Sequence, residues 1–258
     1  MQNIRQNFVT QNRTFHTPQR IVPRGIMLHS VGTPQPRSDV FIRNMNTQTA
    51  ATSWHGIIDP EGNVTQTLEW TMRAWHAGGG ANNTHIGIEM TEPSTIRYTS
   101  GANFVDNNSQ ATGAHVRATY ETAIKLFAYL CKEFGLNPLA DGVIISHSEG
   151  HRRGVASNHA DVEHLWSRFG LSMNGFRRDV AEEMDREEAV EVIKVEKRFE
   201  KVEELPLWAR PYIERLQNKR ATDGLPVLRG DENGNLDLSL DMIRLMVIME
   251  RLQEQKES

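Results

Sequence analysis

The chain has 258 residues, 38% of them hydrophobic, and its 29 Lys and Arg against 33 Asp and Glu give a net charge of −4. This length suits one large domain or one medium and one small domain, and cores of that size form without disulfides. The single cysteine cannot form an internal disulfide, which fits folding in a reducing compartment. The mildly acidic balance argues against an extended phosphate-binding surface, so we expect no nucleic-acid partner.

The amino-terminal stretch, residues 1–20, is polar from its first residues. It lacks the continuous apolar run that a signal peptide needs, and nothing downstream approaches the ~20 apolar residues of a membrane span. We therefore expect a protein that is cytoplasmic on synthesis and has no membrane partner.

Short β-rich runs and helical patterns alternate from the amino terminus onward. Residues 26–32 (IMLHSVG) predict a buried strand, because apolar residues surround a single histidine. Ser38 is the expected cap of a helix that runs through Asn46. Residues 54–68 predict a hairpin, because two β-prone runs flank the turn sequence DPEGN.

The same alternation continues up to the middle of the chain. Residues 85–90 (HIGIEM) alternate like a strand with one buried face. Residues 112–134 carry apolar side chains at helical spacing, and Gly135 predicts the end of that helix. Residues 142–146 (GVIIS) predict another buried strand, which leads directly to His147. Strands interleaved with helices predict an α/β fold.

The composition changes after about residue 173. We predict a first domain at 1–173, a charged helical linker at 174–204 and a small helical C-terminal module at 205–258. The linker is dense in charges of both signs, as in a solvated helix. The module has two amphipathic helical patterns, too few to bury much surface alone, so it packs tightly on itself, docks on the first domain or oligomerises.

All ten histidines lie in the first domain, and residues 147–164 form the densest group of possible metal ligands. The order His147-Ser148-Glu149-Gly150-His151 does not match the metalloprotease motif His-Glu-x-x-His. A zinc deaminase would need two further thiolates, which a single cysteine cannot supply. Both classes of site are therefore rejected.

A zinc site assembled across separate strands remains. Catalytic zinc takes three protein ligands and keeps an open position for water. His29 and His147, each at the end of a predicted strand, and Asp161 in the following loop are the right residue types. A strand-terminal histidine is also common as a purely structural residue, so both interpretations stay open at this point.

Five motifs, in this order, resemble the type 2 N-acetylmuramoyl-L-alanine amidases. They are MLHSVG, SWHGIIDPEGNVTQTL, AWHAGG, HIGIEM and ISHSEG…SNHADV, spread over about residues 20–170. That superfamily also contains the amidase-type phage lysozymes and the peptidoglycan recognition proteins. The resemblance implies a mixed sheet flanked by helices, a groove holding one zinc ion, and hydrolysis of the bond between the muramyl lactyl group and L-alanine in peptidoglycan.

The resemblance also implies roles for individual residues. The positions of the three zinc ligands are held by His29, His147 and Asp161. Glu89 matches the acid that serves as general base in the amidase branch. His159 stands where many members have a lysine that contacts the scissile carbonyl, so we expect it to be catalytic too.

Two positions depart from the family pattern. Trp54 stands where some phage enzymes have a catalytic tyrosine, so that role is absent or passes to Glu89. The loop between His147 and Asp161 is longer than in the commonest members, which lets His151 compete as the second ligand. We favour His147 because it directly follows a buried strand.

Five further residues are candidates for substrate binding: Trp54, His55, His76, Arg152 and Arg153. The two histidines each follow a tryptophan, and aromatic faces suit sugars, although packing at strand ends explains them equally well. The two arginines can pair bidentately with a carboxylate of the stem peptide. Solvated loop arginines are the plainer interpretation.

We therefore expect an endolysin-like zinc amidase that acts on the cell wall after release. One alternative is a cytoplasmic amidase that recycles muropeptides, and another is a non-catalytic module that binds peptidoglycan. Recognition members typically lose the third ligand, so Asp161 together with Glu89 argues against the second alternative. The C-terminal module loosely resembles a surface-layer-homology unit, which implies wall binding or dimerisation through its helices.

Overall fold

The computed structural model of the chain describes residues 4–195 and 198–257. Residues 1–3, 196–197 and 258 lie outside the described residues; they belong to the predicted first domain, linker and C-terminal module. Among the residues that are described, no helix has the length and apolar character that crossing a bilayer requires.

The chain forms two compact units, residues 1–186 and 187–258. The division falls within helix α6 (Met173–Val195), because the start of this helix belongs to the first unit. Phe176 and Val180 of α6 are fully buried in the core of the first unit. That core therefore extends past residue 173, into the segment whose charge density predicts a solvated linker.

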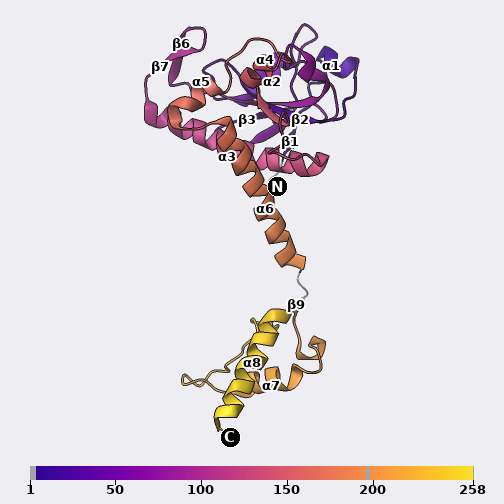
Figure 1. The fold of residues 1–258 in the computed structure, drawn as a ribbon, viewed down its shortest axis with the longest axis vertical. Helices are drawn as coiled ribbons and strands as arrows, with labels where there is room; N and C mark the ends of the chain where they lie inside the picture. The colour runs from indigo at the N-terminus through magenta and orange to yellow at the C-terminus, as the bar shows by residue number, and fades with distance from the viewer. Residues whose placement is uncertain (1–3, 196–197, 258) are drawn as a thin grey trace. The chain divides into compact units, whose positions relative to one another are not determined.

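A six-stranded mixed sheet with the order β1-β4-β3-β5-β2-β8 is the centre of the first unit (Figure 1). The strands are β1 (Arg5–Gln6), β2 (Gly25–Ser30), β3 (Gly56–Ile58), β4 (Val64–Gln66), β5 (His85–Met90) and β8 (Ile144–Ser146). Strands β3 and β4 form the predicted antiparallel hairpin, and all other neighbours are parallel. The predicted α/β fold with a mixed central sheet is confirmed.

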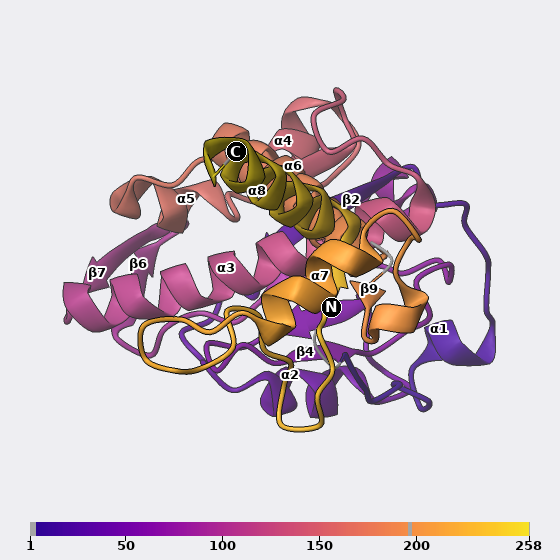
Figure 2. The same ribbon diagram turned by 90° about the horizontal axis from the view of Figure 1, so that it is seen from below.

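Alternation along the strands gives the sheet two different faces. Ile26 and Leu28 of β2 pack on the long helix α3 (Ser109–Phe134), which runs along one face of the sheet (Figures 1 and 2). Met27 and His29 point to the opposite face, where Met27 joins a separate small apolar cluster. Strand β5 lies between β2 and β3, so it is buried on both faces rather than on one as predicted.

Helix α3 shows why some boundaries can be predicted from local residue types. The Asn108 side chain accepts a hydrogen bond from the Ala111 N–H at the start, and Gly135 ends the helix with a left-handed φ of 63°. The predicted end is confirmed, and the helix begins three residues before Thr112.

Helix α2 (Ser38–Met45) forms as predicted, but its predicted cap is wrong. The N-cap residue is Arg37, and no side chain caps this helix. Ser38 is the first helical residue, and its hydroxyl donates instead to Asp59 Oδ2 at 3.2 Å. A long-range partner has replaced the local hydrogen bond that the sequence favours.

Short elements complete the first unit. They are α1 (Arg13–His16), η1 (Gly80–Asn83), β6 (Ile96–Ser100), β7 (Asn103–Asp106), α4 (His147–Arg152), α5 (Glu163–Trp166) and η2 (Ser167–Phe169). Strands β6 and β7 pair with each other as a separate antiparallel hairpin. This hairpin, the ends of β2 and β5, the start of α4 and the segment before α5 carry side chains of the site described below.

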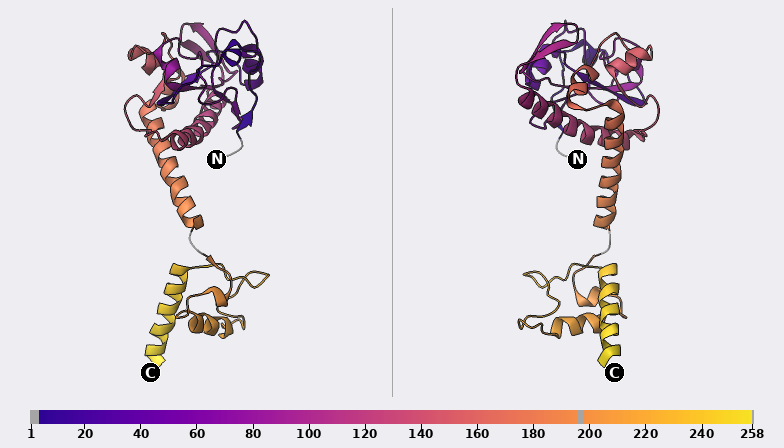
Figure 3. Two further views of the ribbon diagram at one scale, coloured as in Figure 1. Left: turned by 90° about the vertical axis from the view of Figure 1, so that its right-hand side faces the viewer. Right: turned by 60° about the vertical axis from the view of Figure 1, so that its left-hand side comes forward.

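The second unit contains β9 (Arg198–Phe199), η3 (Val202–Glu204), α7 (Arg210–Asn218), β10 (Leu238–Ser239) and α8 (Leu240–Glu257). Both predicted helices form and contact each other (Figure 3). Their core centres on Ile213 and Ile243, both fully buried. Helix α8 also has exposed apolar side chains at Met242, Leu245, Ile248, Met249 and Leu252.

Candidate metal centre

The parallel strands β5, β2 and β8 bring the side chains of the site to one face of the sheet, near the ends of these strands. His29 of β2 is directly paired with Glu89 of β5, so both side chains project from the face opposite α3. Ser146 ends β8 beside Leu28 and caps α4 through a capping box with Glu149, which fixes His147 as the first helical residue.

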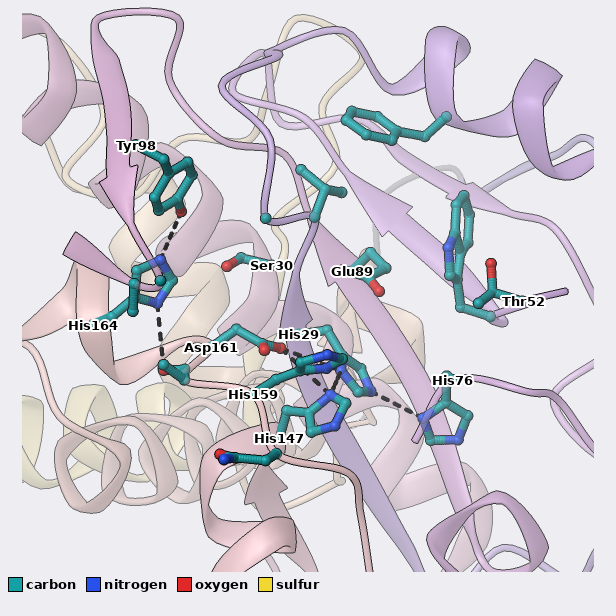
Figure 4. Close-up of a pocket in the computed structure, with 18 residues that line it drawn as sticks. His29, Ser30, Thr52, His76, Glu89, Tyr98, His147, His159, Asp161 and His164 are labelled. Carbon is teal, nitrogen blue, oxygen red and sulfur yellow. Dashed lines mark hydrogen bonds and ion pairs between the residues drawn. The ribbon is translucent and has the colours of Figure 1, made fainter. Parts of the chain in front are cut away.

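Three buried side chains converge near these strand ends: His29, His147 and Asp161 (Figure 4). The Nδ1 atoms of the two histidines lie 3.0 Å apart. Asp161 Oδ2 is 3.3 Å from His29 Nδ1 and 3.7 Å from His147 Nδ1. The ligand atoms of all three lie within 4.8 Å of one another. His151 is exposed on α4, so the structure brings His147 and not His151 to this cluster.

Hydrogen bonds determine which nitrogen of His29 carries a proton. His76 Nε2 lies 3.1 Å from the His85 carbonyl, which can only accept, so His76 Nε2 is the donor. His76 Nδ1 then accepts from His29 Nε2–H at 2.9 Å. This chain leaves the lone pair of His29 Nδ1 facing the cluster. Gly87 makes the arrangement possible, because a Cβ there would lie 2.4 Å from His76 Cγ.

A second chain of hydrogen bonds does the same for His147. The Ser157 hydroxyl donates to the Ala77 carbonyl, and its oxygen lies 3.1 Å from His147 Nε2. His147 Nε2–H is therefore the donor to Ser157, and its Nδ1 lone pair also faces the cluster. Two imidazole lone pairs and one carboxylate converging on a point are the donor set of a three-ligand zinc site with oriented histidines.

The electrostatics of the cluster favour a single positive charge. Burial lowers the pKa of His29, but the hydrogen bond with Asp161 and the charges of Glu89 and Asp161 outweigh it, so the net shift is upward. Burial and the charge of His29 lower the pKa of His147 to about 4. The raised pKa of His29 and the lowered pKa of His147 therefore favour one positive charge among these three side chains, beside Asp161.

Glu89 lies beside the cluster, and both its pKa and its lack of a hydrogen-bond partner are unusual for a carboxyl group. Burial is the main cause that raises the pKa of Glu89 to about 7; the charge of His29 opposes this shift and that of Asp161 adds to it. Within the described part of the chain, Glu89 Oε2 is buried without a hydrogen-bond partner. An unpaired carboxylate with a pKa near neutrality is typical of a group that exchanges protons at pH 7.

This unpaired acid predicts a pH-dependent cost in stability. The pKa of Glu89 is raised from 4.5 to about 7, so its ionisation destabilises the fold progressively as pH rises from about 4.5 to about 7 and fully above that. In metal-free protein, Glu89→Gln should therefore raise the unfolding free energy by about 3 kcal/mol at pH 8. The gain should vanish near pH 4.5, as urea unfolding with chelator present would measure; an equal gain at both pH values would contradict the shift.

A pocket of about 820 Å³ opens above the cluster. Phe41 and Trp54 are among its lining residues. Tyr98 and His164 also line it and lie next to each other (Figure 4). His159 is exposed and also lines the pocket, with its ring edge-on to His147 at 4.5 Å between centroids. His159 therefore lies where a substrate held at the cluster would pass, whereas Trp54 borders the pocket but is buried in a hydrophobic cluster.

The predicted substrate-binding histidines occupy buried positions instead. His55 is fully buried; its Nε2–H donates to the Met72 carbonyl at 2.7 Å and its Nδ1 accepts from the Gly87 N–H at 2.9 Å. His55 thus keeps no polar atom for a ligand and lies outside the pocket lining. His76 reaches the pocket wall, but both of its ring nitrogens are bonded, so it orients His29.

The two predicted arginine clamps also point elsewhere. Arg152 pairs with Glu163 at 2.9 Å, and Arg153 pairs with Asp141. Neither arginine lines the pocket. Both arginines thus make ion pairs at the surface, and a role for either in binding a stem-peptide carboxylate stays a prediction.

Several residues at the site could not be identified from the sequence. They are Ser30, Glu92, Tyr98 and His164, which form one hydrogen-bonded group at the pocket. Glu92 carries a weak signal, because it is an acid just after a buried strand. His164 carries another weak signal as the last histidine of the group at 147–164, but Tyr98 carries none, because a separate hairpin brings it to the site.

Comparisons with known proteins show the family and a similar fold. A sequence model of the family described as N-acetylmuramoyl-L-alanine amidase matches residues 18–163, more than half of the chain. The fold is similar to that of the Staphylococcus aureus hydrolase AmiA (TM-score 0.57, 15% identity, 73% of this chain and 86% of that one). It is also similar to that of a point mutant of PlyL, with a TM-score of 0.51 and 16% identity over 70% of this chain and 99% of that one. The PlyG catalytic domain has a similar fold as well, with a TM-score of 0.50 and 16% identity over 71% of this chain and 96% of that one. No curated protein matches the chain significantly.

Proposed function

Because the chain belongs to the N-acetylmuramoyl-L-alanine amidase family, we propose that it is a zinc-dependent enzyme that hydrolyses the amide bond between N-acetylmuramic acid and L-alanine in bacterial peptidoglycan. The observation that carries this proposal is the convergence of two oriented imidazole lone pairs and a carboxylate beside an unpaired Glu89. A purely recognising module has no need for a buried acid of this kind.

His29, His147 and Asp161 would hold the zinc ion. Zinc bound by three protein ligands acts as a Lewis acid and makes hydroxide available near pH 7. His76 and Ser157 keep both imidazoles in the tautomer that ligation needs, so the ligands are in place before any metal arrives.

Glu89 acts as general base and then as general acid. It projects from the same face as His29, and its pKa of about 7 lets it accept a proton from the attacking water and return it to the departing L-alanine amine. His159, at the pocket surface, donates a hydrogen bond to the scissile carbonyl oxygen as negative charge develops there. Phe41, half-buried at the pocket, offers an aromatic face to the sugar, and the small exposed part of Trp54 borders the same pocket.

Release of new L-alanine amino groups from purified cell walls tests the proposal. The zinc-loaded protein should release them, and exhaustive chelation should stop the release until zinc is restored. Activity on soluble muropeptides alone would favour the muropeptide-recycling alternative. Wall binding without release, at any zinc concentration, would favour the recognition module.

We place this activity at the cell wall, reached after the protein is released from the cell that makes it, as in an endolysin. In this setting the intact wall is the substrate, and soluble fragments are its products. The resemblance to a superfamily that contains the amidase-type phage lysozymes supports the lytic setting over a metabolic one.

The C-terminal module has wall binding and dimerisation as its candidate roles. Met242, Leu245, Met249 and Leu252 are each more than 40% exposed and are spaced by three, four and three residues along α8. Such a stripe is self-complementary, because an antiparallel copy sets Met242 opposite Leu252 and Leu245 opposite Met249. We therefore propose association with a second copy, and a monomeric mass in sedimentation at high concentration would contradict it.

A further inference from the structure

A buried carboxylate close to the three candidate metal ligands takes no part in the reaction proposed above. Glu92 is fully buried just after β5. Its Oε1 accepts hydrogen bonds from the Ser30 hydroxyl at 2.7 Å and the Gly32 N–H at 3.2 Å, and its Oε2 accepts from the Tyr98 hydroxyl at 2.8 Å. A carboxylate in this position is strongly destabilising unless such donors are all present.

The Tyr98 hydroxyl extends this network to His164. Since its proton goes to Glu92, its oxygen accepts from His164 Nε2–H at 2.7 Å (Figure 4). His164 Nδ1 lies 3.3 Å from the Ala160 carbonyl. The Tyr98 phenol therefore bridges the Glu92 carboxylate and the His164 ring, and His164 Nε2 lies 3.9 Å from Glu92 Oε1.

The network joins the two segments that carry metal ligands. Ser30 directly follows His29 at the end of β2. His164 lies in α5, three residues after Asp161. Tyr98 comes from the separate β6–β7 hairpin and stands between them. One buried group of hydrogen bonds thus ties the end of β2 to the turn after Asp161.

We propose that Glu92, Tyr98 and His164 are positioning residues that fix the distance between His29 and Asp161 and thereby set the affinity of the site for zinc. The inference rests on the proposed function for the identity of the metal. Partners that orient metal ligands commonly change metal affinity by about 10- to 100-fold when they are removed.

Tyr98→Phe is the sharpest test, because it removes one hydroxyl and keeps the ring. We expect its zinc Kd, measured by competition with a chelating dye, to rise about 10- to 100-fold. Tyr120→Phe is the matched control: the Tyr120 hydroxyl donates to Asp179 Oδ2 at 2.5 Å, also a bond between a partly buried phenol and a carboxylate, but away from the pocket. It should lower stability without changing the zinc Kd.

Glu92→Gln provides a second variant of nearly unchanged shape. Its amide can still accept from Ser30 but presents N–H₂ toward Tyr98, so zinc binding should weaken here too. An unchanged zinc Kd in Tyr98→Phe, or an equal loss of affinity in Tyr98→Phe and Tyr120→Phe, would overturn the inference. A wild type that binds zinc but releases no amino groups from walls contradicts the proposed function alone.

Discussion

Glu89→Gln should lower turnover on purified walls by about 10²- to 10⁴-fold, the usual contribution of general acid–base catalysis. The amide keeps the size of the carboxyl group but cannot take a proton from water at neutral pH. Because Glu89 is not among the three converging ligands, zinc content should stay near one per chain. Turnover of walls and metal analysis of the same sample check both parts.

Glu61→Gln is the matched control for this variant. Glu61 is an exposed acid in the turn of the β3–β4 hairpin, so its replacement should leave turnover unchanged. Near-normal turnover of folded, zinc-loaded Glu89→Gln would instead assign the base to another residue. His159 would be the next candidate for the general base, because it lines the pocket whereas His55 is fully buried and does not line it.

His147→Ala should reduce bound zinc from about one ion per chain to near none and abolish wall hydrolysis. Removing one of three ligands leaves His29 and Asp161 alone, and two protein ligands do not hold zinc against competing chelators. Metal analysis after dialysis against a weak chelator, with the wall assay beside it, measures both effects.

His151→Ala separates this expectation from a general effect of histidine loss. His151 lies four residues further along α4 but is exposed. The variant should keep zinc and activity. Loss of zinc in His151→Ala with retention in His147→Ala would reverse the ligand assignment and move the metal to the surface of α4.

The elements that the sequence predicts well are those whose cause is local. Apolar runs such as residues 26–32 identify central strands, and Gly135 ends α3 through its own backbone freedom. Ser38 failed as a cap because Asp59, distant in sequence, offers it a competing partner. Phe176 falls in the predicted solvated linker because charged residues dominate the sequence around it, but its side chain packs in the core of the first unit.

The site follows the same division between local and long-range causes. His29 and His147 are recognisable because each ends an apolar strand, and Asp161 because it closes a motif. The tautomers of these histidines depend on a backbone carbonyl and a serine that no spacing reveals. His55 was misplaced because a histidine beside a tryptophan looks the same in sequence whether it lines a groove or bonds the backbone behind it.

The hydrogen bonds that orient His29 and His147 come entirely from protein groups, and the main core lies on the other face of the sheet. Folding of this chain is therefore separable from metal uptake, unlike that of small domains whose zinc supplies the folding energy. The ion should be exchangeable in the native state, so that cobalt or manganese can be substituted for zinc without refolding. The proposed zinc site would then be formed by folding alone, and we expect its occupancy to depend on the metal available where the protein acts, not on the conditions under which it folded.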